Sequence, residues 1–450
     1  MRRKRQRKPV FLSFILLLLA AAGVSFIIIA TLMDDTPAKP ASGQIADSAS
    51  PGDRQPDATS TIGIQEPEAT ATPSPAITPS PSPSLPPSPT VSPSPSPPPK
   101  PEFAEAEWIA VGDVMMHKPQ VPGAYDEKTK TYNFNSYFTL VKPILSQGDW
   151  VLANLETPVA GSSYGYTGYP SFNAPVELLE ALEYAGFNIL TTANNHSLDK
   201  GGKGLLRTLD NLKKYKFAIK GTAASQAEAN KNVIIEKNGI KMGLLSYTYG
   251  TNGIPLPQGK PYMVSLIDEK KMIADIAKTK AAGADFVTIA LHFGIEYQTQ
   301  PNDEQKRLAR KLVAAGADII AGSHPHVIQP YEVLETTDEE GKTRQGLIIY
   351  SMGNFISNQR EETKDYGIIY KVLIRKNIAD HTIQFGEIET IPTWVHRYQP
   401  DNNYRYRILP VEQTLEAFAT GTKDELLSAA DYNAMESTLK QLRKRMSAMK

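Results

Sequence analysis

The sequence has no cysteine among its 450 residues, and its 48 basic and 48 acidic residues give a formal net charge of zero. The absence of cysteine excludes disulfides and thiolate metal sites, so a bound metal must use His, carboxylate and amide ligands. Such ligands suit a divalent Mn, Zn, Fe or Ca ion. The charge balance provides no general electrostatic reason for binding nucleic acid, and we expect no such partner.

The N-terminus carries a basic cluster followed by a long apolar segment. Residues 1–9 include six Lys or Arg, and residues 10–33 are almost uninterruptedly apolar. About 20 apolar residues span a bilayer as a helix, and a basic flank stays on the cytoplasmic side. A cleaved signal peptide is the alternative, because residues 20–22 are all alanine. The apolar run continues well beyond them, which favours an uncleaved, single-pass anchor in the cell membrane with the C-terminal domain outside the cytoplasm.

Residues 34–102 form a segment of a different composition, rich in Pro, Ser and Thr and poor in apolar side chains. Such a segment cannot bury a core and is typical of disordered or polyproline II linkers. We therefore expect it to be a spacer between the anchor and a folded domain.

Residues 103–400 alternate short apolar runs with amphipathic stretches, a pattern that indicates an α/β domain. The expected early strands are residues 108–111, 150–155, 188–192, 286–291 and 318–321. The expected helices are residues 175–185, 204–215, 269–282 and 304–315. Asn238-Gly239 between two apolar runs predicts a β-hairpin. The pattern becomes β-like after His326, and residues 401–450 are expected to be a helical extension.

Polar residues directly follow five of these expected strands, and among them stand Asp113, Glu156, Asn195 with His196 and Asp199, His292, and His324 with His326. The carboxyl ends of parallel strands lie at one edge of a sheet, where ligands bind. If the five strands share a sheet, the clusters meet there. Each residue alone has a simpler explanation as a helix cap, a turn or a satisfied core residue. Their recurrence at the same place in successive units favours a shared metal site.

Several motifs carry a resemblance to a known family. The chain resembles the CapA/PgsA family of poly-γ-glutamate capsule proteins over about residues 106–360. The motifs that carry it are Gly112-Asp113-Val114-Met115, Asn154-Leu155-Glu156-Thr157-Pro158, Ala193-Asn194-Asn195-His196-Ser197-Leu198-Asp199, His292-Phe293-Gly294-Ile295-Glu296-Tyr297, His324-Pro325-His326-Val327 and Tyr350-Ser351-Met352-Gly353-Asn354-Phe355.

The resemblance implies a calcineurin-like, metallophosphatase-like four-layer α/β/β/α sandwich, with two central sheets and two metals held by residues from the strand ends. One metal would be held by Asp113 and His326, and Glu156 would bridge to the other. The ligands of the second metal would be Asn195, His292 and His324.

The resemblance also implies a catalytic pair. His196 would be the general acid that protonates the leaving oxygen, and Asp199 would orient its ring, although Asp199 is equally well explained as a helix cap. The sequence departs from the superfamily's first motif, Asp-x-His, because Val114 and Met115 follow Asp113. The nearest histidine is His117, a weaker candidate, and the number of bound metals stays open.

Two functions follow from the resemblance. The first is a surface hydrolase that acts on a phosphoester, amide or related bond of a wall or capsule polymer. The second is a non-catalytic scaffold or polymer-binding accessory of the synthesis and export complex. Both place the protein with the membrane, with an anionic polymer such as poly-γ-glutamate and with membrane polymer synthase subunits. A purely structural wall protein would leave the strand-end histidines unexplained.

Overall fold

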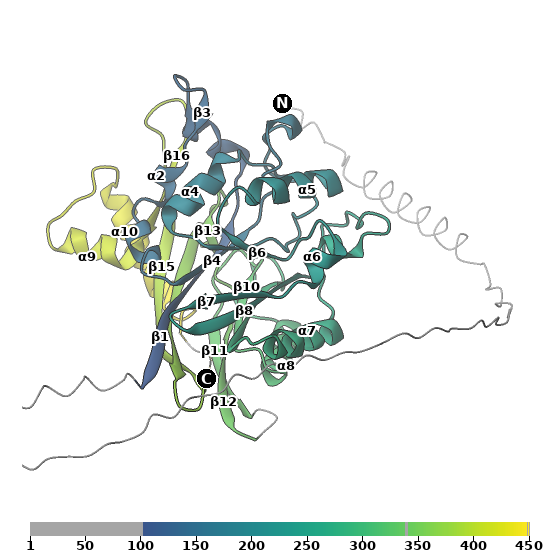
Figure 1. Ribbon diagram of the computed structural model, residues 1–450. Coiled ribbons are helices and arrows are strands. Elements are labelled where there is room, and N and C mark those ends of the chain that lie inside the picture. Colours follow the sequence, from purple (N-terminus) through teal and green to yellow (C-terminus); the bar gives the residue numbers. More distant parts are fainter. Residues whose placement is uncertain (1–101, 338–340, 448, 450) are drawn as a thin grey trace, which may run out of the picture. The chain divides into compact units, whose positions relative to one another are not determined.

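The computed structural model describes residues 102–337, 341–447 and 449 (Figure 1). The predicted cytoplasmic segment 1–9 and membrane anchor 10–33 lie outside the described residues, as does the predicted linker except for its last residue. Within the described ranges, no helix combines the length and the apolar character needed to cross a bilayer. The described residues form a mixed α/β structure built on two large sheets.

The first sheet has eight strands in the order β16-β15-β14-β1-β4-β5-β6, with β13 beside β1. Its parallel part pairs β1 with β4, β4 with β5, and β5 with β6, whereas β14, β15 and β16 are antiparallel. The strands are β1 (Phe103–Val114), β4 (Trp150–Leu155), β5 (Ile189–Thr191), β6 (Ala218–Lys220), β13 (Asn354–Ile356), β14 (Tyr366–Asn377), β15 (Ile383–Tyr398) and β16 (Arg405–Pro410).

The second sheet has six strands in the order β11-β12-β10-β9-β8-β7. These are β7 (Val233–Lys237), β8 (Ile240–Thr248), β9 (Phe286–His292), β10 (Ile319–Ser323), β11 (Tyr331–Thr337) and β12 (Thr343–Ile349). The hairpin predicted at Asn238-Gly239 is confirmed, since β7 pairs with β8 and both turn residues have positive φ, 50° and 79°.

The two sheets share one apolar core and carry helices on their outer faces. Along β1, Trp108 contributes to the core between the sheets, whereas Ile109 contributes to the outer core. This alternation follows from the two-residue period of a strand and explains why β1 is apolar on both faces. The outer core of the first sheet includes α4 (Glu177–Ala185) and α5 (Gly201–Leu212). That of the second includes α7 (Glu269–Ala281) and α8 (Asp303–Ala314), which lie side by side in Figure 1.

The C-terminal region differs from the predicted helical extension over residues 401–450. It begins with β16, which pairs with β15 and buries Tyr406 and Ile408 on alternate positions. The helices α9 (Val411–Ala419) and α10 (Ala429–Leu442) follow, and α10 adds Met435 and Leu439 to the core shared by the sheets. The alternation of Arg405-Tyr406-Arg407-Ile408 is a strand signal that the helical prediction passed over.

Short elements complete the described structure. They are the helices α2 (Asn135–Phe138), α3 (Lys142–Leu145) and α6 (Gln226–Asn230), and the small hairpin of β2 (Tyr125–Asp126) and β3 (Thr131–Tyr132). Brief 3-10 turns add to the connections between β1 and β4.

Candidate metal centre

The predicted ligands lie at the ends of strands from both sheets rather than of one sheet. Asp113 is the last residue but one of β1 and Glu156 follows β4 in the first sheet, whereas His292 ends β9 and His324 follows β10 in the second. The five strands therefore do not share one sheet, whereas the two central sheets that the resemblance implied are present. The predicted ligands still lie close together, because the two sheets pack face to face and these strand ends meet at the same edge.

Two glycines allow this close approach. A Cβ on Gly112, directly before Asp113, would lie 1.8 Å from the carbonyl oxygen of Gly353. A Cβ on Gly322, two residues before His324, would lie 2.1 Å from the carbonyl oxygen of Tyr350. Only glycine leaves room for the facing backbone at these two positions. Glycine thus brings the ligand-bearing strand ends against the segment between β12 and β13.

Asp113 is fully buried and has polar partners on both carboxylate oxygens. Its Oδ1 accepts a hydrogen bond of 2.8 Å from Asn154 Nδ2, and its Oδ2 lies 3.1 Å from His326 Nδ1. Burial opposes ionisation, but the hydrogen bond and the charge interaction with His326 outweigh it and hold the pKa of Asp113 below its ordinary value. Asp113 therefore provides an anionic carboxylate at the floor of the centre.

His326 has its two ring nitrogens in different surroundings. Nδ1 lies 3.1 Å from both Asp113 Oδ2 and Asn354 Oδ1, which are acceptors, so Nδ1 carries the hydrogen. Nε2 faces Glu156 Oε1 at 3.8 Å. A ligating histidine is typically held in this way, with one nitrogen donating to a carboxylate or carbonyl and the other free for the metal.

Glu156 is fully buried, and its Oε1 has no hydrogen-bond partner among the described residues. This oxygen lies 3.5 Å from His292 Nε2 and 3.8 Å from His326 Nε2. Burial, followed by the charge of Asp113, raises the pKa of Glu156 well above its ordinary value. Two carboxylates in one buried space repel each other unless a cation lies between them, so this pair fits a bridging role for Glu156.

The remaining histidines are held in their neutral form, which is the form that binds metals. Burial, followed by the neighbouring His324, lowers the pKa of His292 well below its ordinary value. The pKa of His324 is lowered to about 3, mainly by burial and secondly by the charge interaction with His326. His292 Nδ1 lies 3.0 Å from Ser323 Oγ, and its Nε2 lies 3.0 Å from Asn195 Oδ1. His324 Nδ1 is buried without a partner in the part of the chain that the structure describes.

The donor set fits a divalent cation. Ligand atoms lie within 4.8 Å of one another in two groups that share Glu156, namely Asp113–Glu156–His326 and Glu156–His292–His324. A third group, Glu296–His324–His326, overlaps both. The two unpartnered atoms, Glu156 Oε1 and His324 Nδ1, are costly to bury unless something binds them. Carboxylate oxygens and imidazole nitrogens are ligands of Zn, Mn and Fe.

The predicted catalytic pair is formed beside this set. His196 Nδ1 lies 2.8 Å from Asp199 Oδ2, and both side chains are almost fully buried. The same Asp199 oxygen accepts a hydrogen bond of 2.7 Å from the backbone N–H of Phe172, whose ring packs edge-on against the His196 ring at 4.7 Å. Asp199 therefore fixes the His196 ring rather than capping a helix, because α5 starts two residues later and its N-cap is Lys200.

Asn154 is a residue of the centre to which the sequence gave no role. Its Nδ2 donates to Asp113 Oδ1 and, at 3.2 Å, to Glu156 Oε2, and it lies 3.3 Å from His292 Nδ1. Asn154 thus holds the carboxylates of both ligand groups in position. Its place in the Asn-Leu-Glu motif two residues before Glu156 was the available signal.

Two residues outside the predicted ligand set, Asn354 and His117, differ in their relation to the centre. Asn354 joins the centre through its contact with His326. His117 is in none of the three ligand groups found among the described residues; its Nδ1 accepts a hydrogen bond of 3.3 Å from the backbone N–H of Asn358. The structure therefore does not bring His117 into the place of the histidine that the first motif lacks.

Known proteins similar to this chain fit the resemblance seen in the motifs. The sequence profile of the bacterial capsule synthesis protein PGA_cap matches residues 107–359. The PGA biosynthesis protein CapA of Bacillus subtilis is 32% identical over an alignment of 309 positions, which covers 64% of this chain and 72% of the relative. The capsule biosynthesis protein CapA of Bacillus anthracis is 29% identical over an alignment of 331 positions, which covers 70% of this chain and 75% of the relative.

A solved structure, the calcineurin-like phosphoesterase YfkN from Bacillus subtilis, aligns with a TM-score of 0.37 and 16% identity, over 76% of this chain and 97% of that one. The PGA_cap profile covers more than half of the chain, and the Bacillus subtilis relative is matched over most of its length. The chain therefore belongs to the bacterial capsule synthesis protein family that includes the CapA proteins.

Proposed function

We propose that this chain is a metal-dependent hydrolase of the cell surface that acts on a phosphoester, amide or related bond during production of poly-γ-glutamate or a similar anionic polymer. The observation that carries the proposal is the buried set of Asp113, Glu156, His292, His324 and His326, in which Glu156 Oε1 and His324 Nδ1 lack partners among the described residues. A set of this kind is expensive to bury and is not needed for packing.

The residues of the centre would have separate roles in metal binding and catalysis. Asp113 and His326 would hold one cation, His292, His324 and Asn195 the other, and Glu156 would bridge them. Bound metal would polarise the scissile group and supply an activated water. His196 would move a proton at its Nε2, because Asp199 accepts the Nδ1 hydrogen and fixes the ring. Asn154 would keep both carboxylates in place.

The proposed location rests on the sequence outside the described residues. The apolar segment 10–33 with its basic flank supports a single-pass membrane anchor, and the Pro-rich segment 34–102 supports a spacer that holds the domain away from the membrane. The proposed partners are the membrane, an anionic polymer such as poly-γ-glutamate and membrane polymer synthase subunits. Protease digestion of intact cells, with an antibody to the C-terminal domain, tests this orientation.

A second function is favoured by the altered first motif. Val114 and Met115 are buried apolar residues where the superfamily has a metal-binding histidine. A centre with fewer ligands would suit a scaffold, or a binder that holds the polymer's carboxylates through bound metal. In that case polymer release depends on the anchor and on the metal ligands but not on His196.

The test uses the full-length protein in three forms. These are the wild type, His196→Asn, and the control His381→Asn, which changes an exposed histidine in the turn between β14 and β15. Metal content is measured by inductively coupled plasma mass spectrometry, and turnover is measured with nitrophenyl phosphate esters and poly-γ-glutamate. The hydrolase proposal expects bound metal and turnover that only His196→Asn abolishes. Metal without turnover, together with normal polymer release from cells carrying His196→Asn, would favour the accessory function.

A further inference from the structure

The third ligand group contains a carboxylate that the first two lack. Glu296 is exposed, on the loop after β9, and its carboxylate lies within 4.8 Å of ligand nitrogens of the buried His324 and His326. We propose that Glu296 is a metal ligand that joins His324 and His326 on the solvent side of the centre. This inference rests on the proposed metal function and adds a ligand that the superfamily motifs do not supply.

The loop that carries Glu296 is fixed to the loop that carries the two histidines. The backbone N–H of Phe293 donates to Ser323 O at 3.1 Å, and that of Tyr297 donates to Pro325 O at 2.8 Å. Glu296 therefore lies between two backbone bonds that join these loops directly beside the histidines. A side chain held this way is positioned by the fold rather than placed near the centre by chance.

A buried glutamine, Gln329, hydrogen-bonds the backbone of the same loop. Gln329 is fully buried, and its Nε2 donates to Gln298 O at 2.7 Å and to Gln300 O at 3.2 Å. Gln305 Nε2 in turn donates to Gln329 Oε1 at 3.0 Å. A buried amide with partners on both ends fixes the backbone that it contacts. The segment after Glu296 is thereby anchored to α8 and to the strand-end region after β10.

Positive φ angles recur in the same place. Tyr297, His324 and His326 have φ values of 67°, 100° and 59°, in a region that few residues other than glycine adopt, although Asn, Asp and His adopt it more often than the rest. Such residues persist only where the surrounding structure enforces them, and they cluster at functional sites. Here all three belong to the Glu296 group or directly adjoin it.

The ligand chemistry explains what Glu296 would contribute. His324 Nδ1 is buried without a partner in the described ranges, and the position where the superfamily has its first histidine is occupied by apolar residues. A carboxylate from the β9 loop would restore a ligand to the cation that His326 binds. Tyr297 also interacts with Glu296, because burial and then the charge of this carboxylate raise the pKa of Tyr297. A purely structural role for Glu296 is therefore the alternative that the experiment must separate.

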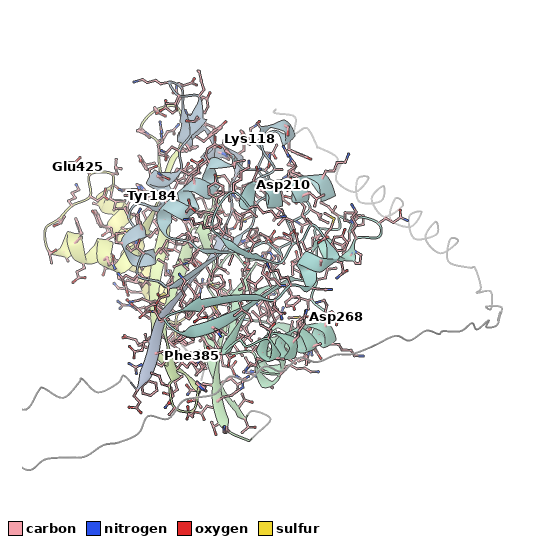
Figure 2. The ribbon with its side chains drawn as sticks, in the orientation of Figure 1. Lys118, Tyr184, Asp210, Asp268, Phe385 and Glu425 are labelled. Carbon is pink, nitrogen blue, oxygen red and sulfur yellow. The ribbon has the colours of Figure 1, made fainter. Side chains whose placement is uncertain are left out.

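The experiment measures binding of Mn²⁺ and of Zn²⁺ by the full-length protein, by calorimetry and by metal analysis after dialysis. The variants are Glu296→Gln, Glu296→Asp and Tyr297→Phe. The control is Glu425→Gln, which removes an exposed carboxylate in the segment between α9 and α10 (Figure 2). If Glu296 binds the metal directly, Glu296→Gln should weaken metal binding about tenfold or more. The loss of a residue that only hydrogen-bonds a ligand already has an effect of this size. Glu296→Asp should also weaken it, because the shorter arm misplaces the oxygen, whereas Tyr297→Phe and Glu425→Gln should leave it unchanged.

The outcomes separate this inference from the proposed function. If the wild type binds neither metal, the metal centre itself is refuted and the role of Glu296 falls with it. If the wild type binds metal and Glu296→Gln binds equally well, only the role of Glu296 is refuted. Weakening by Glu296→Gln but not by Glu296→Asp would indicate a long-range charge effect, and weakening by Tyr297→Phe would indicate a structural role; either result overturns direct ligation.

Discussion

Replacing Glu156 by Gln should separate the metal-binding role of this residue from its role in packing. The side chain is fully buried, so an amide of nearly the same shape keeps the core filled. Asn154 Nδ2 can still donate to the retained amide oxygen, and the new Nε2 would replace Oε1, close to the ring nitrogens of His292 and His326. Without metal, the variant should therefore unfold within about 1 kcal/mol of the wild type, as shape-conserving changes do.

The response to metal should differ sharply. A cation at 100 times its dissociation constant stabilises the folded state by about 2.7 kcal/mol. For a domain of this size such a gain raises the unfolding temperature by roughly 5 °C. The amide of Glu156→Gln cannot bridge two cations as a carboxylate does, so most of this increase should be lost. Differential scanning fluorimetry with and without Mn²⁺ measures both quantities, with Glu425→Gln as the control.

Two results would refute this reasoning. An equal thermal shift with Mn²⁺ in the wild type and in Glu156→Gln would show that the carboxylate does not bind the metal. A loss of several kcal/mol in the variant without metal would show that the charge of Glu156 stabilises the fold itself, contrary to its unpartnered Oε1.

Further predictions concern the scaffold of the centre. Gly112→Ala should lower the unfolding free energy by about 1–3 kcal/mol or prevent folding, because the new Cβ overlaps a facing carbonyl; Gly250→Ala, in open space, should not. Leu312→Ala, in the outer core of the second sheet, should cost about 2–5 kcal/mol in urea unfolding, and Leu426→Ala, which is 46% exposed, less than about 0.5. Burial, followed by a neighbouring arginine, lowers the pKa of His396 to about 4. The fold thus favours neutral imidazole, and its contribution is complete above about pH 6.5 and falls as the pH drops toward 4. Chemical denaturation across this range should show His396→Gln losing less stability on acidification than the wild type, by at most about 3 kcal/mol; equal losses would contradict the assignment.

The sequence predicted the individual strands and helices of the α/β domain well, because both sheets place apolar residues at regular spacings that local pattern reveals. The strand at residues 150–155 matches β4, and the helix at 269–282 matches α7 to within a residue. It missed β16, because the alternation of Arg405-Tyr406-Arg407-Ile408 is a strand signal of only four residues. The helices α9 and α10, which follow β16, dominate the pattern of this region.

The sequence by itself determined which residues follow strands, and a resemblance of motifs then gave a metal-binding meaning to Asp113, Glu156, His292, His324 and His326. Only the tertiary structure decided how they meet, because the spacing along the chain does not say that β1 and β4 lie in one sheet and β9 and β10 in another. The partners of each side chain depend on the packing of those two sheets. That packing left His117 out of the ligand groups, brought Asn154 between two carboxylates and set the exposed Glu296 beside two buried histidines. The motifs contain Asn154 and Glu296, but only the packing shows which side chains they contact.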